Sequence, residues 1–517
     1  MRQEWNETAW SQEQRPQHGT EQGAEIEPGR ASAPPFPALA GEIEVDVAIV
    51  GGGLTGITAA YHLAAAGRRV AVLERRRIGS GETRQTTAFL TEVFDTSLHV
   101  LRGSFGDDGA RDVWKAGQSA IDDIEQIVRR ERIDCGFTRC PAFVHAPDEP
   151  GREELETEHR VATELGLGGT WETSLPFLSH GCLRFERQAR FHPLRYLHAL
   201  AARAERAGAA IFEASPVESW DTGGVVTLKT NAGSVRAAHV LFATHTPLGK
   251  MVSVQTRLKP AQTYVLEGHI PPGRVPGGIY WNTNEPYEYF RIDPLDETRD
   301  RIILGGSDHP TGQAPESDPF VHLEEYARGL LPGLSLNVVR RWSGEIFVST
   351  DGVPFIGSLP GEDNLYLATG FAGNGVTFSN VAARLFRDAV LGMEHPWHDR
   401  IGIGRVQKLA RAAGAVASMA KTLVKDRLGG GGEKISIADI PRGEGAVIRQ
   451  DGKKAAVHVD AGGAVTILSP VCTHMGCDVQ WNSLGQSWDC PCHGSRFHPD
   501  GSVRHGPAIA PLEPGQL

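Results

Sequence analysis

The stretch VDVAIVGGGLTGITAAYHLAAAGRRVAVLE, residues 45–74, constrains the fold of this chain more than any other. An apolar run typical of a buried strand ends at three glycines, and Gly51, Gly53 and Gly56 have G-x-G-x-x-G spacing. Gly51 allows a tight turn, Gly53 lets the backbone approach a pyrophosphate, and Gly56 lets the following helix pack on the strand. Glu74 ends the second predicted strand, where its carboxylate can accept hydrogen bonds from a ribose. The segment therefore predicts a strand–turn–helix–strand unit that binds a dinucleotide.

Size and charge limit the classes of protein to which the chain can belong. Its 517 residues suggest about three domains, and 40% hydrophobic residues is an ordinary globular composition. The net charge of −11 argues against a nucleic-acid surface, which needs clustered Lys and Arg. No stretch approaches the roughly 20 apolar residues of a membrane span, and the first 40 residues contain no apolar export signal. We therefore expect a cytoplasmic protein with no nucleic-acid partner and no transmembrane segment.

The segments on either side of the opening unit differ in kind. Residues 1–40 are rich in Gln, Glu, Pro and Gly and lack an apolar period, so they predict a disordered N-terminal tail. Residues 78–95 are crowded with small and hydroxylated side chains, which suit a loop beside a cofactor as well as a plain surface loop. Residues 193–213 predict a second helix and strand, and 225–245 predict a β-ribbon that runs into a buried strand.

An aromatic segment later in the chain contains the candidate catalytic residues. In YEYFRID, the strand period places Tyr287, Tyr289 and Arg291 on one face, and that face could line a pocket. Tyr289 and Arg291 are the two candidates, although aromatic residues are also common in a protein core and Arg291 could equally form a surface salt bridge. The sequence leaves the catalytic residues unknown.

A second glycine-rich loop follows in ATGFAGNGVTF. Gly370, Gly373 and Gly375 lie between a predicted strand at 365–368 and a helix that begins at 376. A loop that opens onto a helix N-terminus can bind an anion or a ring. The sequence therefore predicts a second contact with the same ligand.

These motifs, in this order, resemble flavoproteins of the D-amino-acid oxidase and glycine oxidase type. The resemblance covers about residues 44–395 and rests on the opening unit, the SPV and FATH segments, DGVPFIG and the ATGFAGNG loop. It implies an α/β fold, in which a Rossmann-like FAD-binding domain is interleaved with a β-rich substrate domain. That domain would span 41–400, and its FAD-binding parts would be about 41–100, 175–250 and 340–395.

The same resemblance implies where FAD binds. The pyrophosphate would lie at the glycines of residues 51–56, the adenosine ribose on Glu74 and the adenine near Val217. The isoalloxazine would lie beside the loop of residues 370–375, covered by the face of the substrate sheet.

Residues 401–433 predict a joint between two domains. RVQKLARAAGAVASMAKTLVKDRL forms a cationic amphipathic helix, and four glycines at 429–432 follow it. The helix could lie on a membrane surface, but an apolar face made mostly of alanine favours a linker helix packed against the preceding domain.

The last segment, 434–517, contains two short Cys/His pairs after alternating segments typical of a small antiparallel barrel. Cys472 and His474 form one pair, and Cys490 and His493 form the other. Such spacing is typical of metal ligands, and a Cys₂His₂ set suits tetrahedral zinc. The segment, however, resembles the Rieske domain, an all-β fold that holds a [2Fe–2S] cluster. The resemblance implies that Cys472 and Cys490 ligate one iron and that His474 and His493 ligate the other.

The Rieske resemblance also implies a role for two further cysteines. Cys477 and Cys492 would form a disulfide that ties the two cluster loops together, which is unusual in a reducing cytoplasm. Rieske proteins of respiratory complexes place a Ser and a Tyr hydroxyl near the cluster sulfurs. Ser495 is present here, but Phe497 stands at the Tyr position, which should lower the potential of the cluster.

Together the two resemblances imply an enzyme with FAD and a [2Fe–2S] cluster. We expect it to oxidise a small amine, amino acid or related C–H donor, with electrons leaving singly through the cluster to a protein or a quinone. In amino-acid-oxidising relatives, an arginine five positions before the Asp of the DG-x-P segment commonly binds the substrate carboxylate. Ile346 stands there, before Asp351, so a plain α-amino acid is disfavoured unless Arg291 substitutes.

Two other functions remain open from the sequence. A Rieske oxygenase needs a mononuclear iron held by two His and a carboxylate, and no such ligand cluster occurs near His239 or His245. The other alternative is a redox-sensing or electron-transfer module without a metabolite substrate of its own.

Overall fold

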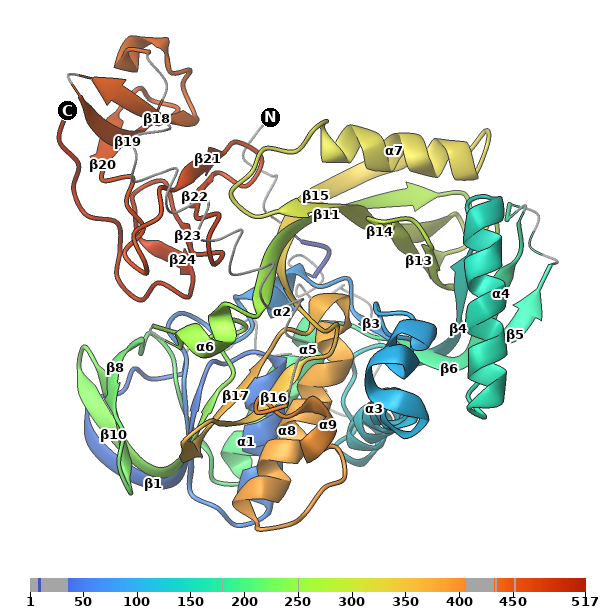
Figure 1. The fold of residues 1–517 in the computed structure, drawn as a ribbon, viewed down its shortest axis with the longest axis horizontal. Helices are drawn as coiled ribbons and strands as arrows, with labels where there is room; N and C mark the ends of the chain where they lie inside the picture. Colours follow the sequence, from blue (N-terminus) through green and yellow to red (C-terminus); the bar gives the residue numbers. More distant parts are fainter. Residues whose placement is uncertain are drawn as a thin grey trace, which may run out of the picture.

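The computed structural model of the chain describes residues 8–10, 36–173, 175, 177–178, 180–249, 251–405, 432, 435–450 and 452–517. It contains two large sheets and a small C-terminal β domain, which lies at one side of both (Figure 1). The predicted linker helix and the glycines that follow it fall outside the described residues, apart from the stretch before 406 and Gly432. Among the helices that are described, none is long and apolar enough to cross a membrane.

The first sheet contains the predicted opening unit and adds strands from two later parts of the chain. Its order is β16-β17-β10-β1-β2-β7, with β9 beside β10 and β8 beside β9. The four pairings among β7, β2, β1, β10 and β17 are parallel, and β2, with the sequence VAVL, is buried throughout, as expected for a strand covered on both faces. Helix α1 packs against α5 and α8. The strands are β1 Gly41–Val50, β2 Val70–Leu73, β7 Ala210–Phe212, β8 Val217–Asp221, β9 Val226–Thr230, β10 Gly233–Phe242, β16 Phe355–Leu359 and β17 Glu362–Thr369, and the helices are α1 Leu54–Ala65, α5 Pro193–Arg206, α8 Gly375–Val390 and α9 His398–Ile401.

The second sheet is mainly antiparallel and lies between the first sheet and helix α7 (Figure 1). Its order is β15-β11-β14-β13-β12-β4-β6-β3, with β5 beside β6, and the β12–β4 pairing is parallel. Helix α7 packs on β11 and β14, and α4 packs on β4 and β6. The elements are β3 Phe89–Leu90, α3 Leu98–Arg130, β4 Thr138–His145, α4 Glu149–Glu164, β5 Thr170–Glu172, β6 Cys182–Arg190, β11 Leu258–Ile270, β12 Gly278–Asn282, β13 Tyr289–Asp296, β14 Arg299–Pro310, α7 Pro319–Leu330 and β15 Asn337–Ser349.

The two sheets are interleaved along the chain, and this confirms the predicted fold class. The chain leaves the first sheet after β2, returns to it at β7–β10 and returns again at β16. Strands β6 and β15 belong to the second sheet, where β6 pairs with β4 and β15 pairs with β11. The resemblance instead groups residues 175–190 and 340–349 with the FAD-binding parts.

Parts of the predicted tail are buried in the fold. Trp10 is fully buried, its Nε1 donates to the Thr86 carbonyl at 2.7 Å, and its ring lies 5.1 Å from the Arg291 guanidinium. Phe36 is also buried, and its backbone N–H donates to the Glu213 carboxylate at 3.0 Å. The prediction of disorder is therefore wrong for residues 8–10 and 36–40, because a few apolar side chains in a polar segment are enough to fix it on the core. Residues 1–7 and 11–35 lie outside the described ranges.

The C-terminal domain consists of two small antiparallel sheets, as its alternating sequence predicts. One sheet has the order β18-β19-β20 and the other has the order β21-β22-β23-β24. Their shared interior includes the buried Trp488 and Phe497 and four cysteines. The elements are the 3-10 helix η2 Ile437–Asp439, β18 Glu444–Gln450, β19 Lys453–Val459, β20 Val465–Leu468, β21 Gln480–Asn482, β22 Ser487–Asp489, β23 Arg496–Phe497 and β24 Val503–His505.

Candidate functional site

A cavity of about 550 Å³ lies where the carboxyl ends of the first sheet meet the second sheet. Its wall combines the glycine turn after β1, the loop between β17 and α8, and the facing side of the second sheet. Residues 502–503 and 505–506 of the C-terminal domain close part of it. Open α/β sheets bind ligands at the carboxyl ends of their strands, so this cavity is the candidate site.

The glycine turn is shaped as its sequence predicts. Gly51 has a φ of +110°, and a Cβ on Gly51 would lie 2.4 Å from the Ala243 carbonyl oxygen. A Cβ on Gly56 would lie 2.0 Å from the Gly51 oxygen, so helix α1 could not pack as closely with any other residue there. A Cβ on Gly53 would instead meet only Thr83 Oγ1, at 3.1 Å, and Gly53 lines the cavity. The turn therefore leaves room at Gly53 for a pyrophosphate at the N-terminus of α1, and it fits FAD.

The two residues predicted for the adenosine end lie beside this turn. Glu74 lines the cavity, and its carboxylate accepts the backbone N–H groups of Gly52 at 2.8 Å and Arg76 at 2.9 Å. Val217, at the start of β8, lines the cavity together with Pro216. Backbone N–H groups thus orient the Glu74 carboxylate beside the turn.

The second glycine loop forms another part of the wall. Gly373 lies in the 3-10 helix η1 (Ala372–Asn374), Gly375 begins α8, and both line the cavity. Gly370 has a φ of +74° and turns the chain after β17, but it does not line the cavity. A Cβ on Gly373 would lie 2.6 Å from Tyr287 Oη and 2.9 Å from Asp95 Oδ2. The loop therefore brings its backbone directly against the facing wall.

That facing wall is acidic and aromatic. Tyr287 Oη donates to the Asp95 carboxylate at 3.3 Å, and Asp95 also accepts the Gly373 backbone N–H. Tyr289 Oη lies 3.2 Å from Thr263 Oγ1, beside Asp308. Burial raises the pKa of Asp95 to about 6 and that of Asp308 to about 7. Both aspartates and both tyrosines line the cavity.

Arg291 does not share this wall with the tyrosines. It is 2% exposed, its guanidinium contacts Asp293 at 2.7 Å, and it donates to the carbonyl oxygens of Thr87 and Ala88. The strand period places Arg291 on the same face as Tyr289, but Trp10 and the chain before β3 cover that part of the sheet. The expectation that Arg291 lines the pocket is therefore wrong, and Tyr289 is the candidate that remains in the cavity.

The two Cys/His pairs lie on two loops of similar shape in the C-terminal domain. The Cys472 carbonyl accepts the Gly476 N–H at 3.0 Å, and the Cys490 carbonyl accepts the Gly494 N–H at 3.1 Å. Gly476 and Gly494 have φ values of +80° and +77°, so each loop closes on a glycine in the left-handed region. These turns direct the two pairs toward each other.

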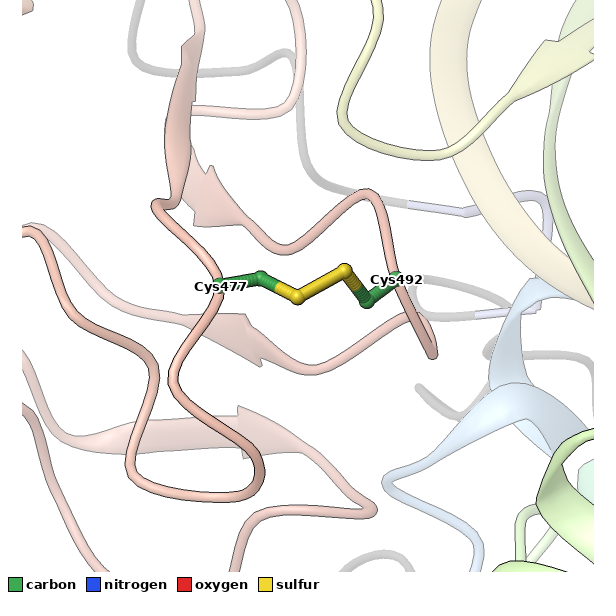
Figure 2. Close-up of a disulfide and its surroundings, with 2 residues drawn as sticks. All are labelled: Cys477 and Cys492. Carbon is green, nitrogen blue, oxygen red and sulfur yellow. A yellow bond between two sulfur atoms is a disulfide. The ribbon is translucent and has the colours of Figure 1, made fainter. Parts of the chain in front are cut away.

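A disulfide joins the two loops between Cys477 and Cys492, 15 residues apart (Figure 2). Both cysteines are nearly inaccessible, at 1% and 4% exposure. Cys135, Cys140 and Cys182 are buried free thiols in the preceding domains, and burial raises the pKa of each, to between about 11 and about 12. Thiols of this kind are inert.

The four predicted cluster ligands fit a [2Fe–2S] cluster. The Cys490 thiol and the Cys472 thiol share a hydrogen bond, which lowers the pKa of Cys472 to about 7. The His474 and His493 ring centroids lie 4.9 Å apart, and both Nδ1 atoms are buried with no hydrogen-bond partner among the described residues. Burial lowers the pKa of both imidazoles, so they are in the neutral form that binds a metal. A sulfur pair beside two imidazoles with free Nδ1 atoms is the donor set of a Rieske cluster.

The geometry is less suited to a single zinc ion. Tetrahedral zinc gathers four donor atoms around one point. Within the described part of the chain, the group of three or more metal-capable residues whose donor atoms all lie within 4.8 Å of one another is Cys477, Cys490 and Cys492, and two of these are in the disulfide.

The hydroxyl predicted near the cluster is present. Ser495 is fully buried, contacts the Cys472 thiol and accepts the Ala508 N–H at 3.1 Å. Phe497 is also fully buried and offers no hydroxyl.

One histidine of the two Cys/His pairs, His474, contacts the larger domain that precedes residue 401. His474 Nε2 lies 2.9 Å from the Gly249 carbonyl oxygen and 3.1 Å from Gln255 Oε1, at the end of helix α6 (Val252–Gln255). Gln255 is 2% exposed, and its Nε2 donates to the carbonyl oxygens of Pro247 and Gly249. The same segment lines the cavity at Thr244, His245 and Leu248. A continuous stretch of chain thus runs from the cavity wall to His474.

Polar contacts on the other side of the cavity hold the same arrangement. The Arg75 guanidinium donates to the Arg504 carbonyl, and His505 Nε2 lies 3.3 Å from Glu82 Oε1, in helix α2 (Glu82–Gln85). A Cβ on Gly494 would lie 2.7 Å from the Pro260 Cβ, so the second cluster loop packs tightly on β11.

Sequence reasoning missed three residues of the site: Asp95, Asp308 and Gln255. The composition of residues 78–95 indicated a loop beside a cofactor, which points toward Asp95, and Glu82 through Asp95 supply much of the wall. Asp308 and Gln255 carry no local signal, because their positions follow from strand register and domain contact.

Known families match both parts of the chain. A model described as FAD dependent oxidoreductase matches residues 46–389, and one described as Rieske [2Fe-2S] domain matches residues 434–514. A Bacillus subtilis protein named as a Rieske 2Fe-2S iron-sulfur protein, YhfW, is 34% identical over 93% of this chain and 95% of its own. The gamma-glutamylputrescine oxidoreductase of Escherichia coli is 26% identical over 69% of this chain and 86% of its own.

Solved structures show the same fold for the larger part. The glycine oxidase of Geobacillus kaustophilus superposes with a TM-score of 0.61 at 22% identity, covering 71% of this chain and 100% of that one. Both resemblances inferred from the sequence, the flavoprotein type and the Rieske domain, are confirmed by the family matches.

Proposed function

Because the chain belongs to the FAD dependent oxidoreductase family and ends in a Rieske [2Fe-2S] domain, we propose that it oxidises a small amine- or amino-acid-like substrate and delivers the electrons singly to an acceptor. Residues 41–400 carry out the oxidation, residues 434–517 carry out the electron transfer, and 401–433 join them. The acceptor is a one-electron protein or a quinone, and the setting is the cytoplasm.

In this proposal the first domain binds FAD and shields the reacting atoms from water. Bound FAD supplies a two-electron acceptor for a substrate hydride. The glycine turn and the N-terminus of α1 bind its pyrophosphate, Glu74 accepts the ribose hydroxyls, and Val217 contacts the adenine. The wall formed by Tyr287 and Tyr289 faces the glycine loop at 370–375, so a substrate enclosed between them is held away from solvent.

In the C-terminal domain, Cys472 and Cys490 would hold one iron of the cluster, and His474 and His493 would hold the other. A bound [2Fe–2S] cluster supplies a one-electron carrier. The Cys477–Cys492 disulfide fixes the two loops relative to each other, and the Ser495 hydroxyl contacts the Cys472 sulfur. Hydrogen bonds to cluster sulfurs raise the potential, so Ser495 raises it while Phe497 leaves it below that of a Ser/Tyr pair.

One observation carries the coupling of the two sites. His474 is hydrogen-bonded to Gly249 and Gln255, and the cavity-lining residues Thr244, His245 and Leu248 lie just before Gly249 in the chain. A cluster ligand that contacts the chain next to the wall of the flavin cavity supports electron transfer within the chain.

An anaerobic titration with a panel of amines and amino acids tests the proposal. One compound should bleach the flavin absorbance in a stopped-flow experiment, and the electron paramagnetic resonance signal of the reduced cluster should then appear. If no compound bleaches the flavin while a chemical reductant reduces both centres, the protein is instead a redox-sensing or electron-transfer module.

A further inference from the structure

The substrate wall of the cavity contains two carboxyl groups without a cation. Asp95 and Asp308 both line the cavity, and neither forms an ion pair within the described ranges. Asp308 is half-buried and hydrogen-bonded to the Thr263 side chain, but its Oδ1 has no hydrogen-bond partner among the described residues. Asp95 is exposed on the cavity side. A carboxylate held away from bulk water is normally paired, because an isolated charge there is costly. The cavity wall therefore keeps carboxyl oxygens whose charge the protein does not balance.

Arginines occur on the same sheet, but they form ion pairs with another carboxylate. Arg190, Arg291 and Arg301 all converge on Asp293, at 2.5, 2.7 and 2.8 Å. Among the described residues that line the cavity, Lys and Arg occur only as Arg75 and Arg76, which adjoin Glu74 at the predicted adenosine end. The substrate wall therefore offers no positive group to a carboxylate.

Aromatic side chains complete the wall around the two aspartates. Tyr287 and Tyr289 lie 5.7 Å apart between ring centroids, and Trp281 and Phe89 line the same part of the cavity. Ile346 adds an apolar side chain at the edge of the second sheet. Aromatic rings together with carboxylates bind organic cations, because both present negative potential.

We propose that this cavity binds a cationic amine that carries no carboxylate on the reacting carbon, with Asp308 and Asp95 holding its ammonium group. The inference rests on the proposed function and narrows its substrate class. A carboxylate on the reacting carbon would be repelled by Asp95 and Asp308, and Ile346 offers it no charge. The ammonium group of an amine instead supplies the positive charge that the two aspartates lack in the protein.

The chemistry balances with the flavin as the oxidant. The Asp308 carboxylate takes one proton from R–CH₂–NH₃⁺, and this frees the nitrogen lone pair. Bound FAD would be the oxidant: it would accept the hydrogen of the adjacent C–H bond together with the bonding electron pair, as a hydride. The C–N bond becomes an iminium, R–CH=NH₂⁺, which water hydrolyses to an aldehyde and ammonium after release.

Ligands that cannot react test the binding step apart from turnover. tert-Butylammonium has no hydrogen on the carbon that bears nitrogen, pivalate is its anionic counterpart of the same shape, and tert-butanol is the neutral one. Each is titrated into the protein loaded with FAD and cluster, and binding is measured by calorimetry and by the change in flavin absorbance. tert-Butylammonium should bind at least about tenfold more tightly than the other two.

Two variants locate the cation. Asp308→Asn and Asp95→Asn should each weaken tert-butylammonium binding about tenfold, and Asn at position 95 still offers a carbonyl oxygen to the Gly373 N–H. Asp363→Asn is the matched control, because Asp363 is exposed on β17 away from the cavity. Unchanged flavin content in each variant shows that the fold is intact. Equal binding of the cation by the wild type and by both cavity variants would overturn the proposal, as would tighter binding of pivalate.

A matched pair of substrates separates this inference from the proposed function. Norvaline is butylamine with a carboxylate on the reacting carbon, and butylamine alone should bleach the flavin faster. If norvaline bleaches it faster, the enzyme function stands and the cationic-amine inference fails. If neither compound nor any other amine or amino acid bleaches it, while tert-butylammonium still binds through Asp308, the cation site stands and the proposed oxidation fails.

Discussion

The four proposed cluster ligands come from one short stretch of chain, residues 472–493, whereas the walls of the flavin cavity come from segments between Val50 and Pro511. The pairing of charged groups differs as well. In the C-terminal domain Arg496 pairs with Asp489 at 3.0 Å and Lys454 with Asp478 at 2.6 Å, but Asp95 and Asp308 in the cavity have no ionic partner within the described chain. The proposed cluster site takes all four of its ligands from two adjacent loops of one domain. The cavity, assembled from distant segments, keeps unpaired groups that a ligand can use.

The largest expected effect is the loss of one site without the other. His493→Ala removes an imidazole whose Nδ1 and Nε2 have no hydrogen-bond partner among the residues that the structure describes, so the cluster should be lost while FAD stays bound. Iron and acid-labile sulfide should fall from about two per chain to near zero, with unchanged flavin content. His498→Ala, in the same domain but outside the proposed ligands, should retain both. Loss of FAD in the His493 variant would show that the two sites are not independent.

A substitution in the glycine turn tests whether the cluster remains when FAD is lost. Gly53→Val places a branched side chain where the cavity is open beside α1, so FAD should no longer be retained while the cluster remains. Flavin released by denaturation and the cluster absorbance give both stoichiometries. Gly329→Val, at an open position of α7, is the control for the substitution itself. Full FAD occupancy in the Gly53 variant would contradict the placement of the pyrophosphate.

The disulfide should matter to one region only. Replacing Cys477 and Cys492 with Ser removes a cross-link across 15 residues, which is worth about 3 kcal/mol in the chain-entropy model. The urea midpoint for loss of the cluster absorbance should fall, whereas the midpoint for flavin release should not. A shared shift of both midpoints would mean that the two domains unfold together.

The next smaller effect is expected from the contact between the C-terminal domain and the cavity region. Gln255→Leu removes one of the two partners of His474 Nε2, together with the hydrogen bonds that Gln255 Nε2 donates to the carbonyl oxygens of Pro247 and Gly249. Loss of hydrogen bonds worth about 1 kcal/mol each should lower the docked fraction, and with it the flavin-to-cluster transfer rate, by roughly tenfold. Stopped-flow absorbance should show flavin bleaching at an unchanged rate and slower appearance of the reduced cluster. Gln313→Leu, at an exposed position, should change neither rate, and an unchanged transfer rate in Gln255→Leu would remove this contact from the electron path.

The same contrast explains what the sequence can predict. The cluster loops, the glycine turn and Glu74 each lie within a few tens of residues, so spacing alone indicates them. Asp308 faces Asp95 only because β14 and the loop before α3 meet across the cavity, and no local pattern encodes that meeting. Arg291 shows the opposite error: strand period gives its face correctly, but Trp10, from a segment with no apolar period, covers it. The fold class follows from the order of the motifs, whereas the substrate wall follows from tertiary contacts.

The smallest expected effect is a pH dependence confined to the cavity. The pKa of Asp308 is raised to about 7, mainly by burial and also by the charges of Asp95, Glu285 and Glu288, while the hydrogen bond to Thr263 opposes this shift. A carboxyl group attracts a cation only when ionised, so tert-butylammonium should bind more tightly as the pH rises through this range and then reach a plateau. Between pH 6.5 and 7.5 the ionised fraction of a group with that pKa grows about threefold, and the affinity measured by calorimetry should follow it.

Asp308→Asn separates this titration from that of its neighbour. The variant should lose the rise near pH 7 and keep a weaker one near pH 6, because burial raises the pKa of Asp95 to about 6. The ligand keeps its charge throughout, so the change belongs to the protein, and Asp363→Asn should follow the wild-type curve. Two results would contradict the proposal: a cation affinity that falls with rising pH, or an affinity that Asp308→Asn leaves unchanged. Either would mean that the carboxyl groups of Asp95 and Asp308 do not contact the ligand.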